Sequence, residues 1–224
     1  MQLTETTMQV LRNYASINPN IVITEGNTLK TISEARNLLS SSTLDVEFPL
    51  TFGVYDLNEF LSVLSLVDQP SLQFEENYVV VGDFVGTSRI KYFYSDLEVL
   101  TKPAKDVKMP STDVSFTLTQ ATLGKVRKAS SVLGHTEMSI TVNDNVLRLS
   151  VLDNNDKTSN AFSIDVDGTF EQEDFNFIFD IRNLKMIDGD YQVNISSKLI
   201  SHFVNKETSV EYWCALEKSS SYGE

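Results

Sequence analysis

The chain has 224 residues, of which 41% are hydrophobic and 22% charged, a composition that is ordinary for a globular protein with one large or two small domains. Its 31 acidic and 18 basic side chains give a formal net charge of −13, which argues against a protein that holds nucleic acid by affinity alone, because phosphate contacts need clustered Lys and Arg. Cys214 is the single cysteine, no apolar run is long enough to cross a bilayer, and residues 1–13 do not have the layout of a secretion signal, so we expect a cytosolic protein without disulfides and without a membrane partner.

The first half predicts two helices, each followed by strands. Apolar residues recur at helical spacing over residues 3–17, and Asn18 with Pro19 is expected to end this helix. A second helix is expected over residues 56–67, with Asp56 as its N-cap and Glu59 three positions later, as in a capping box. Alternating apolar residues between turn residues predict strands at 21–24, 28–32, 43–48, 72–74, 78–81 and 89–94.

A change of composition then separates the two halves. Residues 96–113 contain three lysines and two prolines and show no period, which is typical of an extended connector. We place the connector at residues 101–113, between a first domain of residues 1–100 and a second domain of residues 114–224.

The second half repeats the order of elements of the first. A helix is expected over residues 118–133, ended by Gly134, and a shorter one from the N-cap Asp180 to residue 187. Strands are expected at 137–142, 146–152, 159–166, 175–179, 191–196, 200–204 and 210–216. The segments FGVYDLNEFL (52–61) and FIFDIRNLKM (177–186) align at the second helix of each half. The sequence therefore predicts an α+β protein of two similar domains, each with two helices packed on an antiparallel sheet.

The predicted helices are more basic than the rest of the chain. They carry four acidic residues and six basic ones, namely Arg12, Lys125, Arg127, Lys128, Arg182 and Lys185, while the remainder has 12 basic and 27 acidic residues. If the helices line the inner wall of a ring, these six side chains would face DNA and the acidic outside would repel it. The alternative is that so few helical charges are scattered by chance.

Sequence motifs of catalysis and metal binding are absent. His135 and His202 are the only histidines, and with one cysteine they make no zinc set. The serines come without a G-x-S-x-G elbow, and the Asx-rich run 153–156 lacks the glycine and distal glutamate of a calcium loop. We therefore expect no enzyme activity, no cofactor and no metal.

Three segments carry a resemblance to a known family. The runs LRNYASIN (11–18), YDLNEFLSVLSLV (55–67) and FNFIFDIRNLKMIDGDYQVNIS (175–196) resemble the gene 45 sliding clamp of T-even-type tailed phages, and the length and two-half layout agree. The resemblance implies the DNA clamp fold with curved sheets, and a homotrimeric ring that encircles double-stranded DNA without sequence specificity. It also implies the phage DNA polymerase, a clamp loader and late-transcription factors as partners, in the cytoplasm of the infected bacterial host.

The resemblance also implies two kinds of protein-binding surface. Rings of this type close by pairing edge strands of neighbouring subunits, which by order of elements would involve Arg89, Ile90, Tyr92 and Tyr94 on one side and Ala161, Phe162, Ile164 and Val166 on the other. A pocket beside the connector would take a partner's C-terminal peptide, with Val107, Met109, Pro110 and Leu216 as its candidate lining.

Two other classes of function compete with this interpretation. A trimeric structural or adaptor protein of the virion, with no role on DNA, could have the same charge and repeated α+β units. A small hydrolase is disfavoured because no nucleophile–base set is present.

Overall fold

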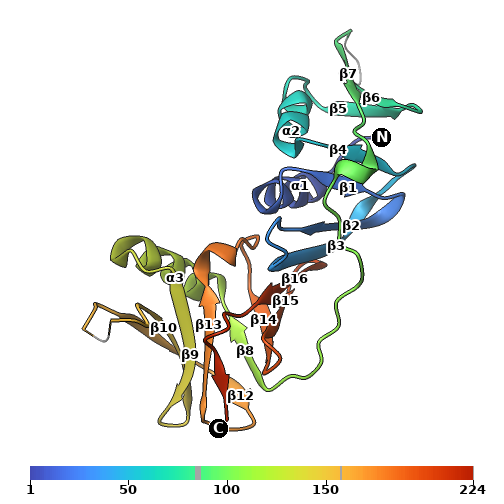
Figure 1. The fold of residues 1–224 in the computed structure, drawn as a ribbon. Coiled ribbons are helices and arrows are strands. Elements are labelled where there is room, and N and C mark those ends of the chain that lie inside the picture. Colours follow the sequence, from blue (N-terminus) through green and yellow to red (C-terminus); the bar gives the residue numbers. More distant parts are fainter. Residues whose placement is uncertain (84–86, 157, 224) are drawn as a thin grey trace. The chain divides into compact units, whose positions relative to one another are not determined.

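The computed structural model describes residues 1–83, 87–156 and 158–223, and the chain divides into two compact units, Met1–Asp106 and Val107–Glu224 (Figure 1). The division falls inside the segment expected to connect two domains. Both units combine α-helix with antiparallel sheet, as the sequence predicts.

The helices of the first unit begin at side-chain caps. In α1 (Glu5–Ile17), Thr4 accepts a hydrogen bond from the backbone N–H of Thr7 at 3.1 Å. In α2 (Leu57–Ser65), Asp56 accepts from the N–H groups of Asn58 and Glu59 at 2.9 and 3.2 Å, so the predicted N-cap is confirmed. The two helices contact each other, and their apolar stripes lie in the core of the unit.

In the described part of the first unit, the strands form three small antiparallel groups. The hairpin β2 (Gly26–Ile32) and β3 (Leu38–Phe48) is one group, and β1 (Ile21–Ile23) pairs with β4 (Phe52–Val54) as the second. The third is a sheet in the order β5 (Pro70–Phe74), β6 (Tyr78–Asp83), β7 (Arg89–Phe93). A 3-10 turn, η1 (Leu97–Val99), follows.

The long strand β3 corrects the prediction of a strand over 43–48 only. Its first half contains Ser40, Ser41 and Ser42, which do not look like strand residues. Ser40 and Ser42 are nevertheless buried, and the Ser40 hydroxyl donates to the Tyr14 hydroxyl at 3.1 Å. Tertiary hydrogen bonding thus holds a polar segment inside the sheet. The strand β4, which contains Gly53, was also not predicted.

The first helix of the second unit, α3 (Gln120–Leu133), starts two residues later than predicted. Leu118 ends the unpredicted strand β8 (Val114–Leu118), and Thr119 is the N-cap, accepting from the N–H of Thr122 at 3.1 Å. Gly134 ends the helix with a φ of 73°, the left-handed conformation that favours glycine.

The predicted second helix of this unit, from Asp180 to residue 187, is wrong. Only a 3-10 turn forms, η2 (Ile181–Asn183), with Asp180 as its cap. The following carbonyl groups of Leu184 and Met186 accept hydrogen bonds from the Arg127 side chain, at 2.7 and 3.0 Å. A partner on another element therefore replaces the hydrogen bonds that a continuing helix would make.

The remaining strands of the second unit form two antiparallel sheets. The first has the order β11 (Phe162–Val166), β10 (Val146–Leu152), β9 (Glu137–Asn143), β13 (Phe175–Asp180), β17 (Ser221–Tyr222). The second contains β12 (Gly168–Phe170), β8, β14 (Tyr191–Ser196), β15 (Ile200–Asn205) and β16 (Val210–Ala215) in that order. Strands β12 and β17 were not predicted, and β11 begins three residues later than expected.

Candidate nucleic-acid interface and sheet edges

Helix α3 presents two lysines to solvent. Leu123 and Val126 are almost fully buried and fix which face of the helix packs inward. Lys125 and Lys128, three positions apart, are both exposed, as expected for side chains one turn apart. Of the predicted DNA-facing residues, these two form the clearest basic pair that the structure brings together.

Arg127, between the two lysines, is held within its own unit. Besides the bonds to the carbonyls of Leu184 and Met186, its guanidinium lies 3.4 Å from the Asp188 carboxylate. These contacts tie the segment after η2 to α3. Its predicted role at DNA stays a prediction, and the structure adds a role in holding that segment.

The other basic candidates lie at helix and turn surfaces. Arg12 on α1 is exposed and forms an ion pair with Glu5 at 2.6 Å. Arg182 on η2 is exposed and bonds both oxygens of Asp180. Burial of Asp180 would raise the pKa of its carboxyl, but the hydrogen bonds from Arg182 outweigh burial and lower that pKa. Lys185 is exposed on the segment that follows.

Strand β7 lies at the open edge of the three-stranded sheet and has two different faces. Ile90, Tyr92 and Tyr94 are half-buried on the face toward α2, where the Tyr92 ring lies 5.1 Å from the ring of Phe60. Burial, followed by the nearby Glu59 and Asp56 charges, raises the pKa of Tyr92 to about 12. The opposite face exposes Arg89, Lys91 and Phe93, and the Phe93 side chain is 65% exposed.

The residues expected at this edge therefore come from both faces of β7, and they include Arg89 from the exposed face but not its neighbours Lys91 and Phe93. The alternation of polar and apolar residues along a strand was the signal that could have separated the two faces. It was weak here because both faces carry an aromatic residue.

Strand β11 lies at the open edge of the other unit's sheet. Phe162, Ile164 and Val166 are half-buried on the face toward α3, while Ser163 and Asp165 are exposed on the opposite face. Asp165 forms a two-point ion pair with Arg148 on β10, at 2.7 and 3.1 Å. Hydrogen bonds from this guanidinium lower the pKa of Asp165.

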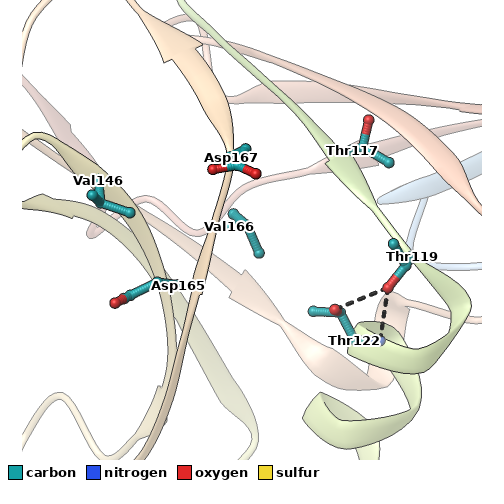
Figure 2. A pocket seen from close by; sticks show the side chains of 7 residues that line it. All are labelled: Thr117, Thr119, Thr122, Val146, Asp165, Val166 and Asp167. Carbon is teal, nitrogen blue, oxygen red and sulfur yellow. Dashed lines mark hydrogen bonds between the residues drawn. The ribbon is translucent and has the colours of Figure 1, made fainter.

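Two hollows are lined by residues of both α3 and β11. One has a volume of about 360 Å³ and is mostly apolar, and it is lined by Lys125, Lys128, Ala129, Val132, Leu133, Ala161 and Phe162. The other, of about 440 Å³, is lined by Thr117, Thr119, Thr122, Val146, Asp165, Val166 and Asp167 (Figure 2). Figure 2 shows that the three threonines come from β8 and the start of α3, facing the end of β11.

The candidate peptide-pocket residues differ in exposure. Val107 and Met109 are half-buried and Pro110 is exposed, in a segment without regular structure. Leu216 is buried, and its N–H donates to the carbonyl of Leu199. The Lys30 ammonium contacts the Asp106 carboxylate at 2.5 Å, which fastens the segment just before these residues to β2.

The described part of the chain offers no group of three His, Cys, Asp or Glu side chains placed to hold a metal. Among the same residues, no helix is long and apolar enough to span a membrane.

Two family models match the chain. The model described as DNA polymerase processivity factor matches residues 4–79, and the model described as gp45 sliding clamp, C terminal, matches residues 115–218. The sliding clamp of Vibrio phage KVP40 is 33% identical over 97% of this chain and 99% of its own length. The sliding clamp of Escherichia phage RB69 is 24% identical over 99% of both chains.

Solved structures show the same fold at lower identity. The A. fulgidus PCNA, solved with the C-terminal region of FEN-1, has a TM-score of 0.72 at 12% identity and covers 98% of both chains. The PCNA of Thermococcus kodakaraensis has a TM-score of 0.69 at 15% identity, covering 95% of this chain and 96% of its own. The predicted α+β DNA clamp fold is thereby confirmed. The family models and the 33% identical relative set aside the virion adaptor. The chain belongs to the phage sliding clamp family, the non-enzymatic processivity factors of DNA polymerase.

Proposed function

We propose that the chain assembles as a homotrimeric ring that encircles double-stranded DNA without reading its sequence and tethers the phage replicative polymerase to it. The observation that carries the proposal is that each unit of this clamp fold ends a sheet in an open edge strand. Within the described residues, β7 pairs only with β6, and β11 only with β10.

Two different edges on one chain favour a head-to-tail assembly. An edge of one copy that pairs with the other edge of the next copy makes a heterologous contact, and such contacts generate a closed ring when the rotation closes. Pairing would also satisfy the backbone groups that an open edge leaves exposed.

The charge distribution suits a ring that slides. Lys125 and Lys128 offer weak phosphate contacts, while the net charge of −13 disfavours wrapping of DNA on other surfaces. A topological hold needs no base contacts and no tight binding. Arg12, Arg182 and Lys185 would add to the same positive field.

The finer partners follow from the family. We propose loading by an ATP-driven clamp loader, a role with late-transcription factors, and action in the cytoplasm of the infected bacterial host. Partner peptides would dock near Val107, Met109, Pro110 and Leu216. The structural relative solved with a peptide of FEN-1 supports a peptide mode of binding for this fold.

Retention on circular DNA tests the proposal. The protein would be loaded on nicked circular DNA with the cognate loader and ATP, and its retention measured before and after the circle is cut. We expect stable retention on the circle and loss from the cut DNA, because only free ends let a ring slide off. Equal release from both forms, or no loading by an active loader, would overturn the proposal.

A further inference from the structure

We infer that the ring-closing strands pair antiparallel in one register, with Arg89 and Lys91 of one copy opposite Asp167 and Asp165 of the next. This inference rests on the proposed ring and names how a second copy of this chain is recognised. Its evidence is the matching of side chains, backbone groups and charge between β7 and β11.

The two faces of each strand restrict the register first. The helix-side face of β7 carries Ile90 and Tyr92, and that of β11 carries Phe162, Ile164 and Val166. Residues directly opposite each other in a sheet point to the same side. Matching apolar with apolar therefore places even-numbered residues of β7 opposite even-numbered residues of β11, and sets Arg89, Lys91 and Phe93 beside Ser163, Asp165 and Asp167.

The backbone groups on the open side of β7 belong to its odd-numbered residues. Ser88 accepts from the N–H of Asp83, and the N–H of Tyr94 donates to Asn77, so both residues bond toward β6 and its hairpin. Antiparallel pairs alternate between bonded and non-bonded. Ile90 and Tyr92 therefore also bond toward β6, which leaves the backbone groups of Arg89, Lys91 and Phe93 facing the open edge.

The backbone groups on the open side of β11 also belong to its odd-numbered residues. Strands β9 and β10 are joined by a two-residue turn, Asp144 and Asn145, with φ values of 51° and 61°. The residues that flank such a turn form a hydrogen-bonded pair, which here is Asn143 and Val146. Alternation then directs Leu147, Leu149 and Val151 toward β11, where they pair with Val166, Ile164 and Phe162. Ser163 and Asp165 are left facing the open edge. Odd-numbered residues thus meet odd-numbered residues, as the side-chain faces also require.

Charge selects one register among the antiparallel ones that remain. With Lys91 opposite Asp165, Arg89 lies opposite Asp167 and Phe93 opposite Ser163, so both cations meet carboxylates. A shift by two residues in either direction loses one of these pairs. A parallel arrangement does not fit the faces, because a residue whose backbone groups face the neighbour would then lie beside one whose groups face away, and Lys91 would lie beside an even-numbered, helix-side residue of β11.

Other groups around these carboxylates are compatible with the register. Arg148 holds Asp165 from the β10 side, which leaves the β7 side of the strand for Lys91. In the single chain, the Lys91 ammonium lies 4.7 Å from the centre of the Tyr78 ring, and Ser163 bonds Ser150 at 2.8 Å. Asp144 is a further carboxylate near Arg148.

Cysteine cross-linking of the full-length protein tests the register. Opposite residues have Cα atoms about 5.5 Å apart, within the range of a disulfide, whereas diagonal neighbours lie about 7–8 Å apart. We expect F93C/S163C to give covalent trimers under mild oxidation and F93C/D165C to give few. Cys214 does not compete, because it is buried and burial raises the pKa of its thiol to about 12.

Charge exchange is the second measurement. R89E and D167R should each weaken monomer–trimer association by about tenfold in sedimentation equilibrium, and R89E/D167R should restore it to within about threefold. The variant K198E, an equal change of charge at an exposed turn residue, should leave association unchanged. Circular dichroism would check that each variant is folded.

The outcomes separate the register from the ring itself. Two outcomes would overturn the register: covalent trimers from F93C/D165C but not from F93C/S163C, or failure of the charge exchange to restore association. If wild-type trimers still form and are retained on circles, the proposed clamp function is unaffected by either outcome. A wild-type protein that stays monomeric and is never retained on circles would overturn the proposed ring, and the register with it.

Discussion

At the scale of single residues, Arg127 shows how a helix position can be predicted while its role is not. Its spacing places it beside Lys125 and Lys128, yet its guanidinium bonds the carbonyls of Leu184 and Met186. Replacing Arg127 by Met should lower the free energy of unfolding by about 1–3 kcal/mol, because the backbone carbonyl groups of the buried residues Leu184 and Met186 lose their hydrogen-bond donor. Urea unfolding at fixed protein concentration measures this.

The neighbouring lysine supplies the control. Lys128→Met removes the same charge from an exposed site and should change stability by less than about 0.5 kcal/mol. Equal effects of the two substitutions would contradict the structural role of Arg127. For the same reason, charge reversal at all three basic residues of α3 would mix DNA contact with folding.

The ionisation of Asp180 should make the free energy of unfolding depend on pH in the acid range. The pKa of Asp180 in the folded chain lies below the ordinary 3.8. The ionised carboxylate therefore contributes to the free energy of unfolding at pH values above the unfolded pKa, and this contribution is lost as pH falls through the folded pKa. Asp180→Asn keeps a side-chain acceptor for the cap but removes the charge that holds Arg182. We expect it to cost up to about 1 kcal/mol at neutral pH, and the difference from wild type to shrink as pH falls from the ordinary pKa of 3.8 through the lower folded pKa. Unfolding curves across pH measure this, and a difference that persists in acid would contradict it.

At the scale of elements, α3 carries the prediction about DNA. Lys125→Glu with Lys128→Glu should reduce loading or residence on nicked circles severalfold while leaving trimers intact, because the phosphate contacts become repulsive. Lys198→Glu with Lys218→Glu gives the same change in net charge at exposed turns and serves as the matched control. Normal loading and polymerase stimulation by the α3 variant would show that this helix does not face DNA.

At the scale of the whole molecule, assembly should be visible in thermal stability. If the folded chain is stabilised by its neighbours in a ring, the unfolding midpoint rises with protein concentration, because association acts only on the folded state. Scanning calorimetry over a hundredfold range of concentration, alongside sedimentation, measures this. A midpoint that does not move while the protein changes from monomer to trimer would mean that the interface adds nothing to stability.

The elements that could be predicted from the sequence are those whose signals are local. Amphipathic spacing and a cap residue were enough for α1, α2 and α3, and Gly134 marked the end of α3. The first half of β3 is not predicted because Ser40 and Ser42 look like loop residues until a buried partner is present. Strand β8 is different, because its alternating Val114, Phe116 and Leu118 are a local strand signal that the prediction overlooks.

The sequence by itself determined the class, the family and the placement of Lys125 and Lys128 on one helix, because helical and strand periods follow from backbone geometry. Only the tertiary structure decided that the segment after Asp180 stops as a single turn, that Arg127 holds it, and which faces of β7 and β11 are open. These features depend on hydrogen bonds and packing between residues far apart in the chain, and no local pattern encodes which distant partner a side chain or a strand edge will meet.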